Sequence, residues 1–188
     1  MAILVATSLA ESRQQSVRQP ESAQSAADAA VLQRFDAAVR QYMLLRRNVV
    51  AELPPLVVTP DPAVIASRSD AIAYAILRAR GQVSTGAFFS PSVAAVLRRR
   101  IAAIANSADF ADIFAPSGDE ASTLKGVDVH ARFPVDSPLA TMPASFLNVL
   151  PPLPLELEYR FIGTTLVIRD VQAALILDLA TDMADRKP

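Results

Sequence analysis

Three ionisable side chains are the strongest candidates for chemistry in this sequence: His130, Asp170 and Asp178. His130 is the single histidine and alternates with Asp128 and Arg132. On a strand, these three side chains would share one face and could form a small acid–base cluster. A solvated strand edge explains the same pattern. No GxSxG motif occurs, so His130 has no evident serine partner for acyl transfer.

Asp170 and Asp178 flank an apolar segment and could act as paired carboxylates in hydrolysis or in calcium binding. On a single extended strand they would be roughly 26 Å apart. That separation is too large for a shared site unless the intervening chain folds back. We therefore interpret Asp170 first as a turn residue that follows a strand.

The composition excludes several classes of site. The chain has no cysteine, which removes disulfides, thiolate catalysis, zinc fingers and iron–sulfur clusters. One histidine cannot supply an HExxH site, and the five glycines form no phosphate-binding motif. We expect neither a cofactor nor a metal.

The charge pattern argues against a nucleic-acid partner. The formal net charge is −1, which gives no long-range field for a polyanion. Arg98, Arg99 and Arg100 are consecutive, so on a helix they point in different directions and cannot form one basic face. We interpret them as a solvated helix end.

Periodicity predicts three main helices in the first two thirds of the chain. Apolar residues at alternating spacings of three and four predict a helix from Asp28 to Leu53, ended by Pro54-Pro55. Asp61-Pro62 and Ser90-Pro91 are helix-start signals. They predict helices from about Pro62 to Arg80, with a buried stripe of Ile65, Ile72, Ile76 and Ala79, and from Pro91 to about Ala105. Shorter elements are expected as a helical turn at 109–114, a turn at 116–119 and a helix that follows Thr141 or Met142, with Phe146, Leu147 and Leu150 inward.

The C-terminal part predicts strands. Alternation indicates a short half-buried strand from Val127 to Phe133. A hairpin turning at Gly163-Thr164 would pair Phe161 with Leu166, Tyr159 with Ile168, and Glu158 with Arg169 on the outer face. Residues 171–180 fit a strand or a helix, and we favour the third strand of a meander.

The N-terminus has features of a targeting signal. Met1 to Ala10 is an apolar run that ends in Ser8-Leu9-Ala10, as a secretory signal does, although it lacks a charged n-region. An apolar strand or a helix cap is the alternative. From Glu11 to Ala27 the composition predicts a flexible tail. We therefore divide the chain into residues 1–27, a signal remnant and disordered tail, and residues 28–188, one α+β domain. We expect no membrane span, and export to the periplasm or the medium, with a cytoplasmic location as the alternative.

Two stretches carry a resemblance. They are LPPLPLELEYRFIGTTLVIRDVQAALILDLA, from Leu150 to Ala180, and RFDAAVRQYMLLRR with DPAVIASRSDAI in the helical part. The chain resembles a group of uncharacterised, exported bacterial proteins. The resemblance implies export and carries no activity, ligand or catalytic residue.

The sequence thus predicts an α+β fold in which a bundle of three main helices packs on a small C-terminal antiparallel meander. For function we expect a non-catalytic envelope or secreted protein that binds a protein partner or ligand, or forms a homo-oligomer. A broad apolar stripe on the first helix is the expected interaction surface, with Phe35, Tyr42, Leu45 and Val49 as its centre. The alternative is a small carboxylate-dependent hydrolase that uses Asp170 and Asp178, with or without His130.

Overall fold

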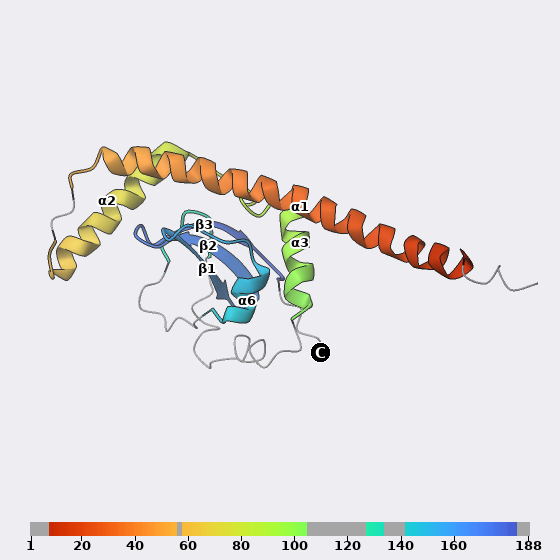
Figure 1. Ribbon diagram of the computed structural model, residues 1–188. Helices are drawn as coiled ribbons and strands as arrows, with labels where there is room; N and C mark the ends of the chain where they lie inside the picture. Colours follow the sequence, from red (N-terminus) through yellow and green to blue (C-terminus); the bar gives the residue numbers. More distant parts are fainter. Residues whose placement is uncertain (1–7, 56–57, 105–126, 134–141, 184–188) are drawn as a thin grey trace, which may run out of the picture.

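The structure is a computed structural model that describes residues 8–55, 58–104, 127–133 and 142–183, the first sixteen of these through their backbone only. The helices are α1 (Ser8–Ala51), α2 (Pro62–Arg80), α3 (Pro91–Ala102) and α6 (Ala144–Val149). The strands are β1 (Leu157–Ile162), β2 (Thr165–Asp170) and β3 (Leu175–Ala180). Helices of the N-terminal part pack on a three-stranded antiparallel sheet of order β1-β2-β3, so the expected α+β architecture is confirmed (Figure 1). The turns expected at 109–114 and 116–119 lie outside the described residues.

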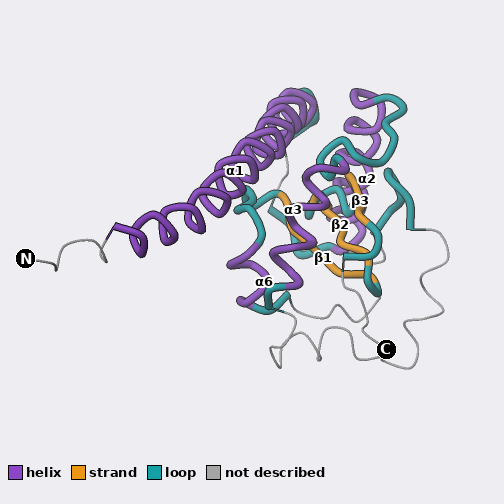
Figure 2. Tube along the Cα trace, turned by 90° about the vertical axis from the view of Figure 1, so that its right-hand side faces the viewer, coloured by secondary structure: helices purple, strands orange, loops and turns teal. Residues whose placement is uncertain are grey.

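Helix α1 is longer than the sequence pattern indicates. It begins at Ser8 instead of Asp28, so the range 11–27, expected to be an irregular tail, is helical. Its glutamine, glutamate, arginine and alanine residues have good helix propensity even though they offer no apolar face. Figures 1 and 2 show this N-terminal half projecting from the rest of the protein, and residues 24–27 are exposed. At about 1.5 Å per residue the 44-residue helix is about 66 Å long.

The start signals of α2 and α3 work as expected. Asp61 caps α2 by accepting the Ala63 N–H at 2.9 Å, and Pro62 is the first helical residue. The Ser90 hydroxyl accepts the Val93 N–H at the start of α3. Helix α2 ends at Arg80 and is capped by Gly81, whose φ of +62° suits glycine.

The hairpin register is confirmed. Phe161 faces Leu166, Tyr159 faces Ile168, and Glu158 faces Arg169. Gly163 has a φ of +56° at the first central position of the two-residue turn. Residues 175–180 form β3, so the strand interpretation of this segment is also confirmed.

A β-bulge interrupts the pairing of β2 with β3. Ile168 faces Asp178 while Arg169 faces Ile176, which leaves Leu177 as the extra residue. Without the bulge, Asp178 would share a face with Ile176. With the bulge, Asp178 lies on the helix-covered face beside Leu177, whereas Leu179 packs on the opposite face with Ile176. The simple alternation of Leu175, Leu177 and Leu179 does not reveal this change.

The strand expected from Val127 to Phe133 is a strap along the free edge of β3. It makes one isolated bridge, Arg132 to Leu175, and contains a turn with a φ of +71° at His130. Its backbone hydrogen bonds nevertheless follow β3, because His130 N donates to Ile176 O at 2.8 Å and Ile176 N donates to Ala131 O at 3.0 Å. The strap covers the face of the sheet opposite the helices, where Phe133 packs on Val167 and Ile176.

The main core lies between the helices and the sheet, and it corrects several expected orientations. Phe35 and Tyr42 are buried in it, while Leu45 and Val49 are half-buried, so the predicted interaction stripe of α1 is largely covered. Ile72 and Ile76 of α2 are buried as expected, but Ala79 is exposed. Phe146 of α6 and Leu150, which caps it, point inward, whereas Leu147 is 52% exposed.

Ile65 also departs from its expected place. It belongs to the same face of α2 as Ile72 and Ile76 by helical spacing, yet 52% of its surface is exposed. Figure 1 shows the cause, since the first turns of α2 extend past the edge of the sheet. An apolar stripe that starts in the core therefore continues onto the surface.

Candidate functional site: a buried polar cluster

Asp170, at the end of β2, is fully buried beneath helix α1. Its Oδ2 atom accepts hydrogen bonds from the Tyr42 hydroxyl at 2.8 Å and from Arg46 Nε at 2.6 Å. Its Oδ1 atom accepts the Ala173 N–H at 2.8 Å, which closes the turn between β2 and β3. Arg46 Nη2 continues to Gln172 Oε1 at 2.7 Å. The predicted turn role of Asp170 is thus correct, and the same carboxylate also joins α1 to the sheet.

The sequence pattern places Tyr42 at the centre of the apolar stripe and gives Arg46 no buried partner. Both lie on the inward face of α1, because positions 35, 39, 42, 46 and 49 alternate at spacings of four and three. An arginine on such a stripe requires a buried acid, and this was the available signal. Burial and the neighbouring Asp170 carboxylate raise the pKa of Tyr42 well above its usual range, so its hydroxyl remains a donor.

Asp178 is the second fully buried carboxylate, and it holds the loop between α2 and α3. Its Oδ2 atom accepts the N–H groups of Phe88 and Phe89, both at 2.7 Å. Its Oδ1 atom accepts the Gly86 N–H at 2.8 Å and the N–H of Leu179, the next residue, at 2.9 Å. Three of these four donors belong to a loop that would otherwise bury unpaired amides. Asp178 therefore supplies the hydrogen-bond acceptors that a neighbouring strand or helix would otherwise give to the amides of this loop.

Arg80, the last residue of α2, lies beside Tyr42, Phe88 and the backbone of β3. Both its terminal nitrogens donate to Leu177 O at 3.2 Å, and its guanidinium stacks 5.7 Å from the ring centres of Tyr42 and Phe88. Burial lowers the pKa of Arg80, while Tyr42 and Asp178 oppose that shift. Tyr42 and Phe88 also contact each other edge to face at 5.9 Å. The cluster is thus continuous from α1 through α2 to the sheet.

The hairpin brings the two aspartates closer than a single strand would. Asp170 faces Leu175 across the sheet, three residues from Asp178, so their backbones are on the order of 10 Å apart. Each carboxylate nevertheless has its own set of donors, and both oxygens of each are occupied. Among the described residues, no group of three histidine, aspartate or glutamate side chains could hold a metal ion. The arrangement is suited to fixing α1 and the 81–90 loop on the sheet.

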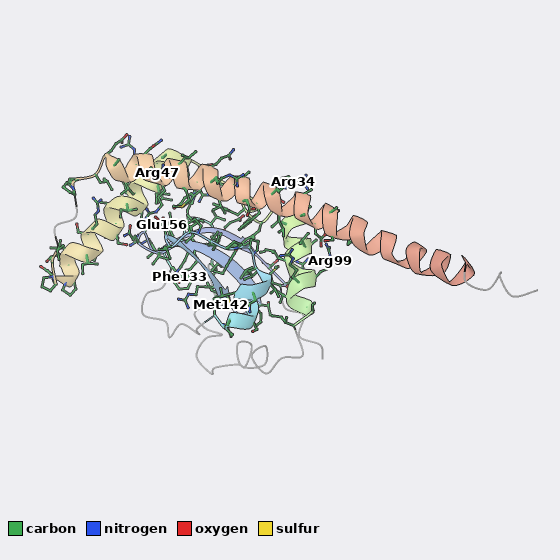
Figure 3. The ribbon with its side chains drawn as sticks, in the orientation of Figure 1. Arg34, Arg47, Arg99, Phe133, Met142 and Glu156 are labelled. Carbon is green, nitrogen blue, oxygen red and sulfur yellow. The ribbon has the colours of Figure 1, made fainter. Side chains whose placement is uncertain are left out.

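A shallow hollow of about 300 Å³ lies nearby, on the solvent side of this cluster. Met43, Arg46, Arg47, Val50 and Ala51 of α1 line it together with Glu156. Figure 3 shows Arg47 on α1 with Glu156 below it. Neither aspartate reaches the hollow, so a ligand placed there would meet Arg46 and Arg47 as its cations and Glu156 as its acid.

The expected cluster of Asp128, His130 and Arg132 does not form. Arg132 turns away to Asp70 of α2 at 2.7 Å and to the Ala173 carbonyl. Asp128 is exposed, and within the described part of the chain its carboxylate accepts only the neighbouring Val129 N–H. His130 is half-buried, and its Nε2 atom has no described hydrogen-bond partner. The strap geometry, with its positive φ at His130, separates the three side chains.

His130 should make stability fall in mild acid. Burial, with a contribution from Arg80, lowers the pKa of His130 below its reference value of 6.5. The unfolded chain then binds the proton more readily, so the free energy of unfolding decreases as pH falls below about 6.5. We expect the stability difference between His130→Gln and the parent to shift in favour of the variant between pH 7 and pH 5, as measured by urea unfolding. A difference that is constant across this range would show that His130 titrates alike in both states.

The three consecutive arginines go to three different partners. Arg98 donates to the carbonyls of Thr181 and Asp182, Arg99 pairs with Asp28 at 2.6 Å, and Arg100 donates to Val149 O. They do not form one face, in agreement with their spacing. Among the described helices, none combines the length and apolar character needed to cross a bilayer. Comparison of the chain with protein-family models, with curated proteins and with solved structures finds no match.

Proposed function

We propose that this protein is a non-catalytic envelope or secreted protein that acts by binding a partner through the surface at the start of α2. The observation that carries the proposal is the apolar stripe of α2, which leaves the core at Ile72 and continues to an exposed Ile65. Val64 beside it is 43% exposed, and Val58 in the preceding loop is almost fully exposed. Apolar groups gathered at one projecting end of a protein are typical of an interaction site.

The buried carboxylates support binding over hydrolysis. A hydrolase that used Asp170 or Asp178 would need a carboxylate oxygen free to meet water or substrate. Asp170 is engaged by Tyr42, Arg46 and the turn, and Asp178 by the 81–90 loop. Their hydrogen bonds account for their burial without a catalytic role.

Export is the part of the proposal that rests on sequence. Its support is the apolar run that ends in Ser8-Leu9-Ala10. Cell fractionation of the full chain, followed by mass determination of its N-terminus, tests this part by itself. Recovery of the uncut chain from the cytosol alone would contradict it.

Site-specific photo-crosslinking tests the binding surface. A photoreactive residue at position 65 should give a defined adduct in cells, whereas one at position 147, which is equally exposed but lies on α6, should not. The partner, once identified by mass spectrometry and purified, should bind the parent and lose at least tenfold in affinity with Ile65→Glu. Leu147→Glu is the matched control. Equal adducts at both positions, or unchanged affinity of Ile65→Glu, would contradict the proposed surface.

A further inference from the structure

An exposed leucine directly precedes one of the residues that line the hollow on α1. Leu155 is 97% exposed and is the neighbour of Glu156, which lines the hollow. The segment that carries Leu155 is held in place, because Leu157 N donates to Pro154 O at 3.0 Å and Val171 N donates to Glu156 O at 2.9 Å. The prolines before it limit its conformations further. Leu155 is thus an exposed leucine on a backbone segment that is held in place next to Glu156.

The hollow matches a leucine side chain in size and lining. Its volume of about 300 Å³ exceeds the roughly 150 Å³ cavity that one large apolar side chain fills in a protein core. Met43, Val50 and Ala51 give it apolar walls. Val171, 40% exposed, donates its N–H to Glu156 O, which places an exposed valine next to Glu156. The hollow is therefore large enough for a leucine side chain, with the residues next to that leucine at the edge of the hollow.

Charge is also self-complementary around the hollow. Arg47 and Glu156 line the same depression, but neither makes an ion pair with a described residue. Arg46, by contrast, is already neutralised by Asp170. If a two-fold axis passes beside the hollow, each Glu156 meets the Arg47 of the other copy, which gives two equivalent pairs.

We propose that the hollow receives Leu155 of a second copy of this chain, in a two-fold symmetric dimer. A small apolar ligand would fill the hollow but leave Leu155 in water. A second copy carries the same leucine and the same hollow. In a two-fold dimer both Leu155 side chains are therefore covered and both hollows are filled, as in any isologous interface. The patch is small compared with the interfaces of obligate dimers, so the dimer is weak and reversible. This interface is separate from the α2 surface and does not depend on it.

Sedimentation across a concentration series tests the dimer. The parent should shift from monomer to dimer as its concentration rises from about 1 to 500 µM, because a small interface gives a weak dimer. Leu155→Glu should weaken association at least tenfold, while Leu147→Glu should leave it unchanged. A parent that stays monomeric throughout, or a dimer that Ile65→Glu breaks and Leu155→Glu does not, overturns the proposal.

A charge exchange makes the test specific for this geometry. Arg47→Glu places two acids in the hollow and Glu156→Arg places two bases there, so each should weaken the dimer. The double variant Arg47→Glu with Glu156→Arg restores both cross-pairs and should recover association to near the parent value. Both single variants change exposed or half-buried side chains with no described ion pair, and circular dichroism checks that each is folded. Additive losses in the double variant would show that these residues do not face each other across a two-fold axis.

Discussion

Asp178→Ala is expected to lower the free energy of unfolding by about 3–6 kcal/mol, the largest effect of any single substitution considered for this chain. The carboxylate accepts the N–H groups of Gly86, Phe88 and Phe89 in a buried place. Its removal leaves these donors without a partner, and each unpaired buried donor costs about 1–3 kcal/mol. Urea unfolding followed by circular dichroism measures the loss.

Two further variants separate this effect from general damage to β3. Asp178→Asn keeps one acceptor oxygen and the shape of the side chain, so its loss should be smaller than that of Asp178→Ala. Asp182→Asn changes an exposed aspartate just after β3, at a φ of +54° that asparagine also tolerates, and should stay within about 0.5 kcal/mol of the parent. If Asp178→Ala unfolds at the same urea concentration as the parent, Asp178 does not hold the loop.

Arg46→Met should cost about 3–5 kcal/mol, because it leaves the fully buried Asp170 without its cation. Methionine keeps most of the packing volume, so the loss reports mainly the unpaired charge. Combining Arg46→Met with Asp170→Asn removes both charges, and the double variant should be more stable than Arg46→Met alone. Tyr42→Phe removes one neutral donor to the same oxygen and should cost less, about 1–2 kcal/mol.

These variants are compared by a double-mutant cycle in urea. Strong coupling between positions 46 and 170 is the expected result. Additivity within about 0.5 kcal/mol would mean that the two side chains contribute independently and that the pair does not hold α1 to the sheet.

The parts of the fold that could be predicted are those set by local rules. Helix starts at Asp61-Pro62 and Ser90-Pro91, and the hairpin at Gly163-Thr164, depend on neighbouring backbone geometry, and all three are confirmed. The start of α1 could not be placed, because its polar N-terminal half has helix propensity but no apolar periodicity. Alternation predicts a strand at 127–133, where the structure has a strap, because alternation cannot reveal the positive φ at His130.

The polar cluster was harder to predict because its members come from distant parts of the chain. Asp170 and Arg46 are 124 residues apart, and Asp178 and Gly86 are 92 apart. The sequence identified both aspartates as unusual, but their partners depend on which helix crosses which strand. The bulge at Leu177, which turns Asp178 toward the helices, has no local signature. Arg46 within an apolar stripe was the one signal that could have indicated a buried ion pair.

The central claim is that the two buried aspartates act in holding the fold together. Amide hydrogen exchange of the unmodified protein tests it most directly at Asp178, which is the only described acceptor for three loop amides. The amides of Gly86, Phe88 and Phe89 should be protected to a degree comparable with Ile168 in the central strand. Exchange of these three amides as fast as that of unprotected loop amides would contradict the account, because Asp178 would then be free for another role.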